Sequence, residues 1–543
     1  MELLEWIDSN DKNENIKLTE RKYFNTMIVG GVCLLTLIFG LTYVLMSKTV
    51  YFWDDSTYWD IGRMLAKKPL NLEFFAEIYR SIGTSDYNYA AAMLPSIWMK
   101  IFGVTRVSYI LAIMVIYLIP TQIVTYLLAK RISKKPLAAY VVCVAAIPAA
   151  VYITVIGFVD IGGVLIGMLC YYLYLRNSEN KSIANSVALG ICLTLSMIFR
   201  RYYAFFSVSF ITAMIIDSIL IKKTMKNTVI TVAACGLSLL LLFYPFFTNI
   251  LLKDYGTLYA SYKYNAYTDL KLITRYFGVA LLAAAVAAIP ISVVRKKDTR
   301  GLFAGLQLLV CAAMFMSTQT HGQQHLLLYI PALSVLLLLF MNSAGKRGAI
   351  LAVCIAGISL VSPFLPRTQP QNIQEIKGLS VLPSYSVKPK RRDDVNEILS
   401  VRRKLDKKIP QDKKCGVLAS SFVINSSILD NAIPSLNLKE TREESSVIGL
   451  PEVDSRDYWR LSELYNCEYI LVANPAQTHL APSEQTIITE AVKSFNEHTD
   501  IAEAFSELQD FKASVGDVEL KLYKRIKDVS KTAQTEFELK LYK

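Results

Sequence analysis

Acidic and basic side chains that could take part in catalysis stand in the polar stretches between the apolar segments of this 543-residue chain. The acidic and neighbouring polar residues are Asp54, Asp55, Asp86, Tyr87 and Asp160. The basic and neighbouring polar residues are Arg200, Arg201, His321, Gln323 and His325. A carboxylate that is partly shielded from water can serve as a general base, because burial raises its pKa toward the working range. Fixed cations in a site of low dielectric stabilise a phosphate or another developing negative charge.

Simpler structural roles remain open for several of these residues. An acid in a long loop is commonly a solvated charge, and Asp160 could cap the helix that follows it. The pair Arg200-Arg201 could reach toward lipid headgroups, and a lipid phosphate is then its nearest anionic partner. His321 and His325 have no third ligand nearby in sequence, so hydrogen bonding to a phosphate or sugar fits them better than metal binding. No zinc-protease, P-loop or dinucleotide motif occurs, so the sequence requires no cofactor and lends no support to a divalent cation.

The elements that must position these residues are membrane-spanning helices. Apolar residues make up 53% of the chain and charged residues 19%, against about 25% charged in soluble domains. The long apolar runs all lie between Phe24 and Pro363, which excludes a single soluble globule, a disordered chain and a disulfide scaffold. A helix that crosses ~30 Å of hydrocarbon needs roughly 20 apolar residues. On that criterion we predict eleven crossings, which begin near Phe24, Arg106, Leu137, Ile161, Ile183, Tyr202, Thr228, Tyr276, Leu302, Leu326 and Ala349.

Lys and Arg gather in alternate connections between the predicted helices, at residues 130–135, 176–181, 222–226, 295–300 and 346–347. Basic residues accumulate in short cytoplasmic loops. One orientation satisfies all five connections, with the N-terminus in the cytoplasm and the C-terminus outside, and it puts every candidate residue on the outer side. The net charge of +13 then follows from the topology, so a nucleic-acid partner loses its main support.

The distribution of apolar residues divides the chain into four segments. We expect a cytoplasmic stretch over 1–23, a transmembrane domain over 24–365, a linker rich in Pro, Gln and Ser over 366–392, and an extracytoplasmic α/β domain over 393–543. The first stretch shows no cleavable signal peptide, so the first span is expected to act as a signal anchor. In the first outer loop, apolar residues at helical spacing over 56–66 and 89–102 predict two short helices on the outer leaflet.

The C-terminal segment alternates helix and strand patterns, which predicts a small α/β domain. Helices are expected over 395–408 and 483–495, and strands over 416–424, 469–473 and 519–524. The six residues 519–524 recur at 538–543, so the two copies could pair as strands or the second could be a dispensable tail. A disulfide between Cys415 and Cys467 is neither required nor excluded. Asn474 and His479 could contact a glycan acceptor, although a plain loop explains them as well.

The order and common sidedness of these features resemble the GT-C glycosyltransferases, especially the branch of protein O-mannosyltransferases and the aminoarabinose transferases that modify lipid A. The resemblance covers about residues 24–363. The Pro-Pro-Leu that often opens the family's second juxtamembrane helix is replaced by Asn88-Tyr89-Ala90, and no MIR-type insertion is visible. The matching residues are Trp53-Asp54-Asp55 after the first span, Asp86 ahead of the segment 94–103, Asp160 in the second outer loop, Arg200 after the fifth span, and the segment 325–331.

The resemblance implies a polytopic α-helical membrane protein of GT-C type, in the plasma membrane of a bacterium. Such enzymes move a sugar, with inversion, from a polyprenyl-phosphate donor to an acceptor hydroxyl on an extracytoplasmic glycan, lipid or protein. Asp54 would be the base, with Asp55 the second candidate. Asp160, the third predicted catalytic residue, and Asp86 would orient the acceptor or the sugar or help tune the base, and Tyr87 and Gln323 would bind substrate. The donor phosphate would be held by Arg200, Arg201, His321 and His325.

Two alternatives to this function stay open at the level of sequence. A transporter or flippase of lipid-linked sugars would also need many spans and intramembrane charge, but the chain shows no obvious repeat and its notable charges cluster at the outer edge. A polysaccharide ligase or polymerase would use similar lipid chemistry and would differ in its acceptor.

Overall fold

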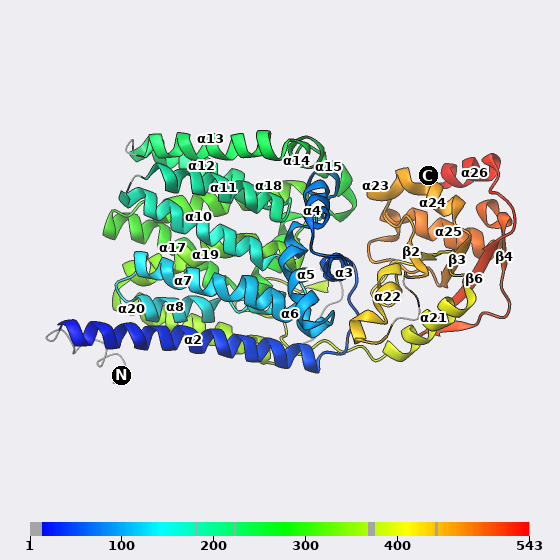
Figure 1. The fold of residues 1–543 in the computed structure, drawn as a ribbon, viewed down its shortest axis with the longest axis horizontal. Helices are drawn as coiled ribbons and strands as arrows, with labels where there is room; N and C mark the ends of the chain where they lie inside the picture. The colour runs from blue at the N-terminus through cyan, green and yellow to red at the C-terminus, as the bar shows by residue number, and fades with distance from the viewer. Residues whose placement is uncertain are drawn as a thin grey trace.

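The computed structural model describes residues 14–180, 182–221, 224–366, 375–439, 442 and 444–541. A bundle of long helices is followed by a C-terminal domain that contains the sheet, and the domain lies against one end of the bundle (Figure 1). The bundle helices are α2 (Glu14–Met46), α6 (Arg106–Ile113), η1 (Met114–Leu118), α7 (Ile119–Ile132), α8 (Pro136–Ala146), α9 (Ala149–Val155), α10 (Ile161–Asn180), α11 (Ile183–Phe199), α12 (Tyr203–Ile221), α13 (Met225–Leu242), α17 (Val279–Lys296), α18 (Arg300–Thr318), η4 (Gln323–Tyr329), α19 (Ile330–Ser343) and α20 (Gly345–Val361).

Eight helices among the described residues are long and apolar enough to cross a membrane. The pair α8 and α9, bent by 54°, counts as a ninth span if it is taken as one. α10 and the shorter α11 run beside these helices in the bundle (Figure 1). The polytopic helical fold is confirmed, whereas the number of eleven crossings and their orientation stay predictions. Side chains such as Leu241 and Val294 point outward and are exposed, as expected for a lipid-facing surface, while α19 is buried at the centre.

The basic connections that the structure describes lie at one end of the bundle. Arg131 pairs with Glu179 between two of these connections. The backbone N–H of Lys134 donates to Asn342, and Arg295 donates to the carbonyl of Ala344. Three of the five connections are thus joined to one another or to the end of α19, which leads directly into the connection at 346–347, as their common sidedness requires. Lys181, Lys222 and Lys223, which also support the predicted orientation, lie outside the described residues.

Short helices cover the end of the bundle that faces the C-terminal domain (Figure 1). α3 and α5 confirm the two helices predicted in the first loop, while α4, between them, was not predicted. Asn71 caps α4 by accepting a hydrogen bond from the backbone N–H of Phe74 at 3.0 Å. The short helices are α3 (Asp54–Lys67), α4 (Leu72–Thr84), α5 (Ala90–Phe102), α14 (Tyr244–Phe246), η2 (Phe247–Leu251), α15 (Tyr255–Leu258), η3 (Ala260–Tyr262) and α16 (Ala266–Phe277).

The predicted linker over 366–392 is packed against the bundle where the structure describes it. The backbone N–H of Val279 donates to the carbonyl of Ser380 at 2.9 Å, and that of Ser384 donates to the carbonyl of Arg275 at 2.7 Å. The ring of Tyr385 stacks on Tyr276, with centroids 4.8 Å apart. The described part of this segment is therefore held against the bundle before the chain enters the C-terminal domain. Residues 367–374 of the predicted linker lie outside the described residues.

The C-terminal domain has a six-stranded mixed sheet, in the order β2-β1-β3-β6-β4 with β5 paired to β6. β1 runs parallel to β2 and β3, and β6 runs antiparallel to β3, β4 and β5. α21 packs on one face of the sheet and α25 on the other. The elements are α21 (Val395–Lys408), β1 (Cys415–Leu418), α22 (Ser426–Asn431), β2 (Val447–Gly449), α23 (Asp454–Asp457), α24 (Leu461–Asn466), β3 (Tyr469–Asn474), α25 (Thr486–Glu497), β4 (Phe505–Glu507), β5 (Ala513–Val515), β6 (Val518–Arg525) and α26 (Lys531–Leu541).

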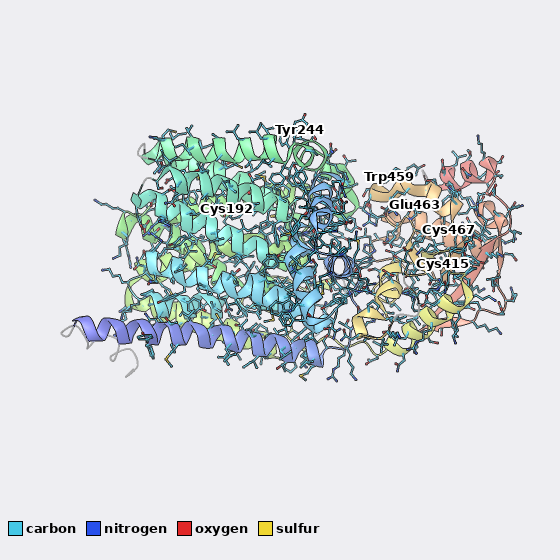
Figure 2. The ribbon with its side chains drawn as sticks, in the orientation of Figure 1. Cys192, Tyr244, Cys415, Trp459, Glu463 and Cys467 are labelled. Atoms are coloured by element: carbon cyan, nitrogen blue, oxygen red, sulfur yellow. The ribbon has the colours of Figure 1, made fainter. Side chains whose placement is uncertain are left out.

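Two predictions for this domain need correction. The strand predicted over 416–424 ends at Leu418. The second copy of the six-residue repeat neither pairs as a strand nor hangs free, because its described residues continue α26, whose Phe537 is fully buried. The same residues are a strand in β6 because β3 and β4 flank them there. Residues 542 and 543 lie outside the described part. Cys415 and Cys467, labelled in Figure 2, are buried free thiols.

Candidate active site

One cavity of about 740 Å³ lies between the helical bundle and the C-terminal domain. Its walls come from the start of α3, the turn before α5, the loop between α11 and α12, the segment 251–264, the loop before η4 and several residues of the C-terminal domain. We call it the interdomain cavity. Seven of the ten predicted site residues line it, namely Asp54, Asp86, Tyr87, Arg200, Arg201, His321 and His325.

Asp54 opens α3 and both of its carboxylate oxygens receive hydrogen bonds. The hydroxyl of Tyr87 donates to Oδ1 at 3.1 Å, and Nε2 of Gln324 donates to Oδ2 at 2.6 Å. The residue before it, Trp53, has a φ of +50°, a backbone conformation that is strained for a bulky side chain. This strained turn brings the Trp53 ring and the Asp54 carboxylate into the same cavity. Asp54 is thus held in a fixed orientation, as a general base requires.

Arg200 lines the cavity and is held from behind by Asp160. Its Nε lies 3.0 Å from Oδ1 of Asp160, and both side chains are almost fully buried. The hydroxyl of Tyr202 also donates to this oxygen. The guanidinium lies over the rings of Tyr58 at 4.6 Å and Tyr87 at 5.5 Å. Asp160 itself does not line the cavity, so the structure makes it a partner that positions Arg200 rather than a group in contact with a ligand.

Asp86 joins two cations on the same wall. Nη1 of Arg201 lies 3.4 Å from its Oδ1 and Nζ of Lys253 lies 2.8 Å from its Oδ2, while the hydroxyl of Tyr255 donates to Oδ1 at 3.0 Å. Burial raises the pKa of Asp86, but the charges of Arg201 and Lys253 outweigh this effect and hold the pKa below its usual value. One carboxylate therefore faces two cations, which leaves an excess of positive charge for an anionic ligand.

The two predicted histidines differ in how many of their ring nitrogens are already hydrogen-bonded within the protein. The ring nitrogens of His321 are both engaged, with Asp269 and with the hydroxyl of Tyr329. Nδ1 of His325 accepts a hydrogen bond from the backbone N–H of Gly322 at 2.8 Å. A neutral imidazole that accepts at Nδ1 carries its proton at Nε2. His325 can therefore donate Nε2–H to a ligand, while His321 stabilises the loop.

Asp55 and Gln323 are predicted site residues that the structure does not bring to the cavity. Successive helical residues point about 100° apart, so Asp55 turns away from Asp54 and lies 3.5 Å from Nζ of Lys390. Burial raises the pKa of Asp55 to about 6, against the opposing charge of Lys390. The amide oxygen of Gln323 accepts a hydrogen bond from Tyr276 at 2.7 Å, and its neighbour Gln324 is the residue that reaches Asp54.

Other cavity residues were missed at the level of sequence. Lys253 could have been found from the sequence, because a Lys on the predicted outer side departs from the positive-inside rule, as Arg200 does. Tyr255 follows it two residues later. Glu452, Arg456 and His479 come from the C-terminal domain. Only the docking of that domain brings them to the cavity, and only His479 was considered as a contact for a glycan. Among the described residues, no group of three or more His, Cys, Asp or Glu is placed to hold a metal ion.

Comparison with known proteins identifies the fold. No family model matches the chain, and no curated protein matches it by sequence. The structure is similar to ArnT from Cupriavidus metallidurans bound to undecaprenyl phosphate, with a TM-score of 0.58 and 11% identity over 92% of this chain and 97% of that chain. It is also similar to the apo state of that protein, with a TM-score of 0.56 over the same shares of both chains.

The chain therefore has the fold of these ArnT structures, in agreement with the GT-C type of fold that the resemblance implies. The similarity extends over the helical bundle and the C-terminal domain, because it covers 92% of the chain. At 11% identity it concerns the fold, and the chemistry has to be argued from the residues of the interdomain cavity.

Proposed function

We propose that this protein is an integral-membrane glycosyltransferase that moves a sugar from a polyprenyl phosphate to an acceptor hydroxyl. The observation that carries the proposal is the interdomain cavity, in which a bonded carboxylate, Asp54, meets the cations Arg200 and Arg201 from distant parts of the chain. A base beside an anion-binding group is what transfer from a phosphate ester needs. The ArnT structure with undecaprenyl phosphate supports a polyprenyl phosphate as the donor lipid.

In the proposed reaction, the acceptor hydroxyl gives its proton to Asp54 while its oxygen forms a bond to the anomeric carbon. The bond between that carbon and the phosphate oxygen breaks, and its electron pair leaves with the polyprenyl phosphate. Direct attack from the face opposite the phosphate inverts the anomeric centre. Tyr87 and Gln324 keep the carboxylate oriented through their hydrogen bonds.

The departing phosphate gains negative charge, which the cations of the cavity are placed to stabilise. Arg200 can hold a phosphate with two parallel hydrogen bonds, and Asp160 fixes its orientation from behind. Arg201 and Lys253 add charge beside Asp86, and His325 adds a neutral donor. The predicted orientation puts this chemistry on the extracytoplasmic side of the plasma membrane.

The test uses the full chain in lipid nanodiscs with radiolabelled pentose and hexose esters of undecaprenyl phosphate and a membrane extract as the source of acceptor. We expect label to move from the lipid to a product of different mobility. Arg200→Ala should weaken binding of undecaprenyl phosphate by roughly 10- to 100-fold, the value of a lost charge-assisted hydrogen bond. Arg403→Ala, on the exposed face of α21, is the matched control and should bind normally.

Two results would contradict the proposal. Binding of undecaprenyl phosphate that does not change in Arg200→Ala would remove the phosphate site. In sealed vesicles, movement of the labelled lipid across the bilayer without any new glycosidic bond would favour a flippase instead.

A further inference from the structure

Part of the interdomain cavity belongs to the C-terminal domain and has no role in the proposed transfer step. Phe422, Glu452 and His479 lie here, opposite the strained turn that carries Trp53. The ring of Trp53 lies 4.4 Å from that of His479 and 5.2 Å from that of Phe422, measured between centroids. We call these three residues, together with the ring of Trp53, the C-terminal wall.

His479 presents a hydrogen-bond acceptor to the cavity. Its Nδ1 lies 3.1 Å from the carbonyl oxygen of Ser420 and 2.9 Å from the hydroxyl of the same residue. A carbonyl can only accept, so Nδ1 carries the ring proton. Burial lowers the pKa of His479 to about 4, so the ring is neutral near pH 7. Nε2 then holds a lone pair, and no described residue donates to it.

Glu452 presents a second acceptor. The hydroxyl of Ser420 donates to its Oε2 at 2.9 Å, and no described residue donates to Oε1. Burial raises the pKa of Glu452 to about 7, although Arg456 opposes this from 3.8 Å. Arg456 is itself engaged, because its Nε and Nη2 donate to Asp457 and its Nη1 donates to Tyr262. The four residues of the wall therefore offer lone pairs and no cation, and the charge of Arg456 beside them is opposed by Asp457 at 2.7 Å.

This chemistry differs from that of the opposite wall. Arg200, Arg201 and Lys253 give that wall its positive charge. On the C-terminal wall, a phosphate or carboxylate would face the lone pair of His479 and the partly ionised carboxylate of Glu452, and both of these repel an anion. A sugar hydroxyl can donate to both acceptors, and the apolar face of a sugar ring can pack on an aromatic ring such as Trp53.

We propose that the C-terminal wall is the acceptor subsite, and that it selects an uncharged sugar at the end of a glycan over an acceptor that carries a phosphate or a carboxylate. This inference rests on the proposed function, because it assigns the second substrate of the same cavity. Trp53 directly precedes Asp54, so a sugar that packs on this ring lies next to the proposed base.

The experiment uses the full chain in phosphatidylcholine nanodiscs that contain undecaprenyl phosphate, without alkyl-glycoside detergents that would compete. The neutral probes are the methyl glycosides of glucose, galactose, mannose and rhamnose, and the anionic probes are glucose 6-phosphate and glucuronic acid. Binding is followed by saturation-transfer NMR and by tryptophan fluorescence, with Trp53→Phe to identify the signal of that residue. We expect at least one neutral probe to bind and the anionic probes to bind at least about 10-fold more weakly.

Two variants change the hydrogen-bond acceptors of the wall. The melting temperature of each variant is measured to confirm that it folds. Glu452→Gln turns its free oxygen into a possible donor, and His479→Phe keeps the ring but removes Nε2. Each should weaken the neutral probe by roughly 10-fold, the value of one good hydrogen bond. Glu452→Gln should also reduce the discrimination against glucose 6-phosphate. The controls on the same domain are Glu463→Gln, labelled in Figure 2, and His498→Asn, and both should bind as the wild type does.

Stronger binding of the anionic probes, no binding of any neutral probe, or equal binding by the wild type and both wall variants would overturn the acceptor subsite. Undecaprenyl phosphate binding is measured in the same samples and should not change in either variant. A protein that binds the neutral probe through this wall but does not bind undecaprenyl phosphate would support the subsite and refute the donor lipid, so the two failures are distinguishable.

Discussion

Replacing Asp160 by Asn should lower stability and raise affinity for undecaprenyl phosphate at the same time. Oδ1 of Asp160 contacts Arg200 and Tyr202, whereas Oδ2 has no hydrogen-bond donor among the described residues. An Asn can therefore keep both contacts through its carbonyl oxygen and put its amide nitrogen in place of Oδ2. The change removes one negative charge and almost no volume.

The two effects can be estimated from the geometry. Breaking a buried ion pair costs about 3–5 kcal/mol, and we expect about 3 kcal/mol here because the hydrogen bonds remain. A phosphate on the far side of Arg200 lies roughly 6 Å from Asp160, and at an effective dielectric constant of about 20 the two charges repel by about 3 kcal/mol. Removing that repulsion should tighten lipid binding by up to about 100-fold.

The assay combines thermal denaturation and a binding titration of the full chain in nanodiscs, each with and without undecaprenyl phosphate. Asp160→Asn should melt at a lower temperature without the lipid and recover with it, because a ligand that binds only the folded state stabilises that state. Asp394→Asn breaks the pair with Arg392, 2.7 Å apart and outside the cavity, and should leave affinity unchanged. Equal or weaker lipid affinity in Asp160→Asn would refute the role of Arg200 as a phosphate ligand.

Three further predictions follow. Asp54→Asn should reduce transfer by roughly 10²- to 10⁴-fold while undecaprenyl phosphate still binds, and Asp55→Asn should retain transfer; the reverse pattern in a radiolabel assay would move the base to Asp55. Asp55 has a pKa of about 6 in the folded protein against 3.8 in the unfolded chain, so the folded state binds more protons between these two pH values. The free energy of unfolding should therefore fall by about 3 kcal/mol as the pH rises from about 4 to 6. Denaturation at several pH values should show this slope in the wild type, and a slope that persists in Asp55→Asn would assign it to another group. Glu452 becomes charged as pH rises through about 7 beside Arg456, Asp457 and the neutral His479. Discrimination against glucuronic acid, whose own carboxylate stays ionised over this range, should therefore increase from pH 6 to 8, and a constant ratio would contradict the role of Glu452.

The sequence predicts the helices and the general place of the site because both follow from local patterns. Hydropathy and the sidedness of Lys and Arg locate the spans, and charges that depart from that sidedness point to Arg200 and Arg201. Short apolar patterns also predict α3 and α5. The family motifs then place Asp54 in the same site.

Finer assignments fail where a single residue step decides the outcome. Asp54 and Asp55 differ by one helical step, which turns one into the cavity and the other toward Lys390. In the same way, Gln324 rather than Gln323 reaches Asp54, since the geometry of η4 is not visible in the sequence. Residues such as Glu452 reach the cavity only because one domain docks on another, which no local pattern encodes.

The first turn of α3 is held by the C-terminal domain, although that domain contains none of the predicted catalytic residues. Ser427 accepts the backbone N–H of Trp53 at 3.1 Å and lies 2.8 Å from the hydroxyl of Ser56, and Asn431 donates to Asp60 at 3.0 Å. An antibody fragment that bound between α22 and α3 would break these hydrogen bonds and free Trp53, the residue next to the proposed base Asp54. Inhibition would then be reached from outside the pocket, by an agent that resembles neither substrate and competes with neither.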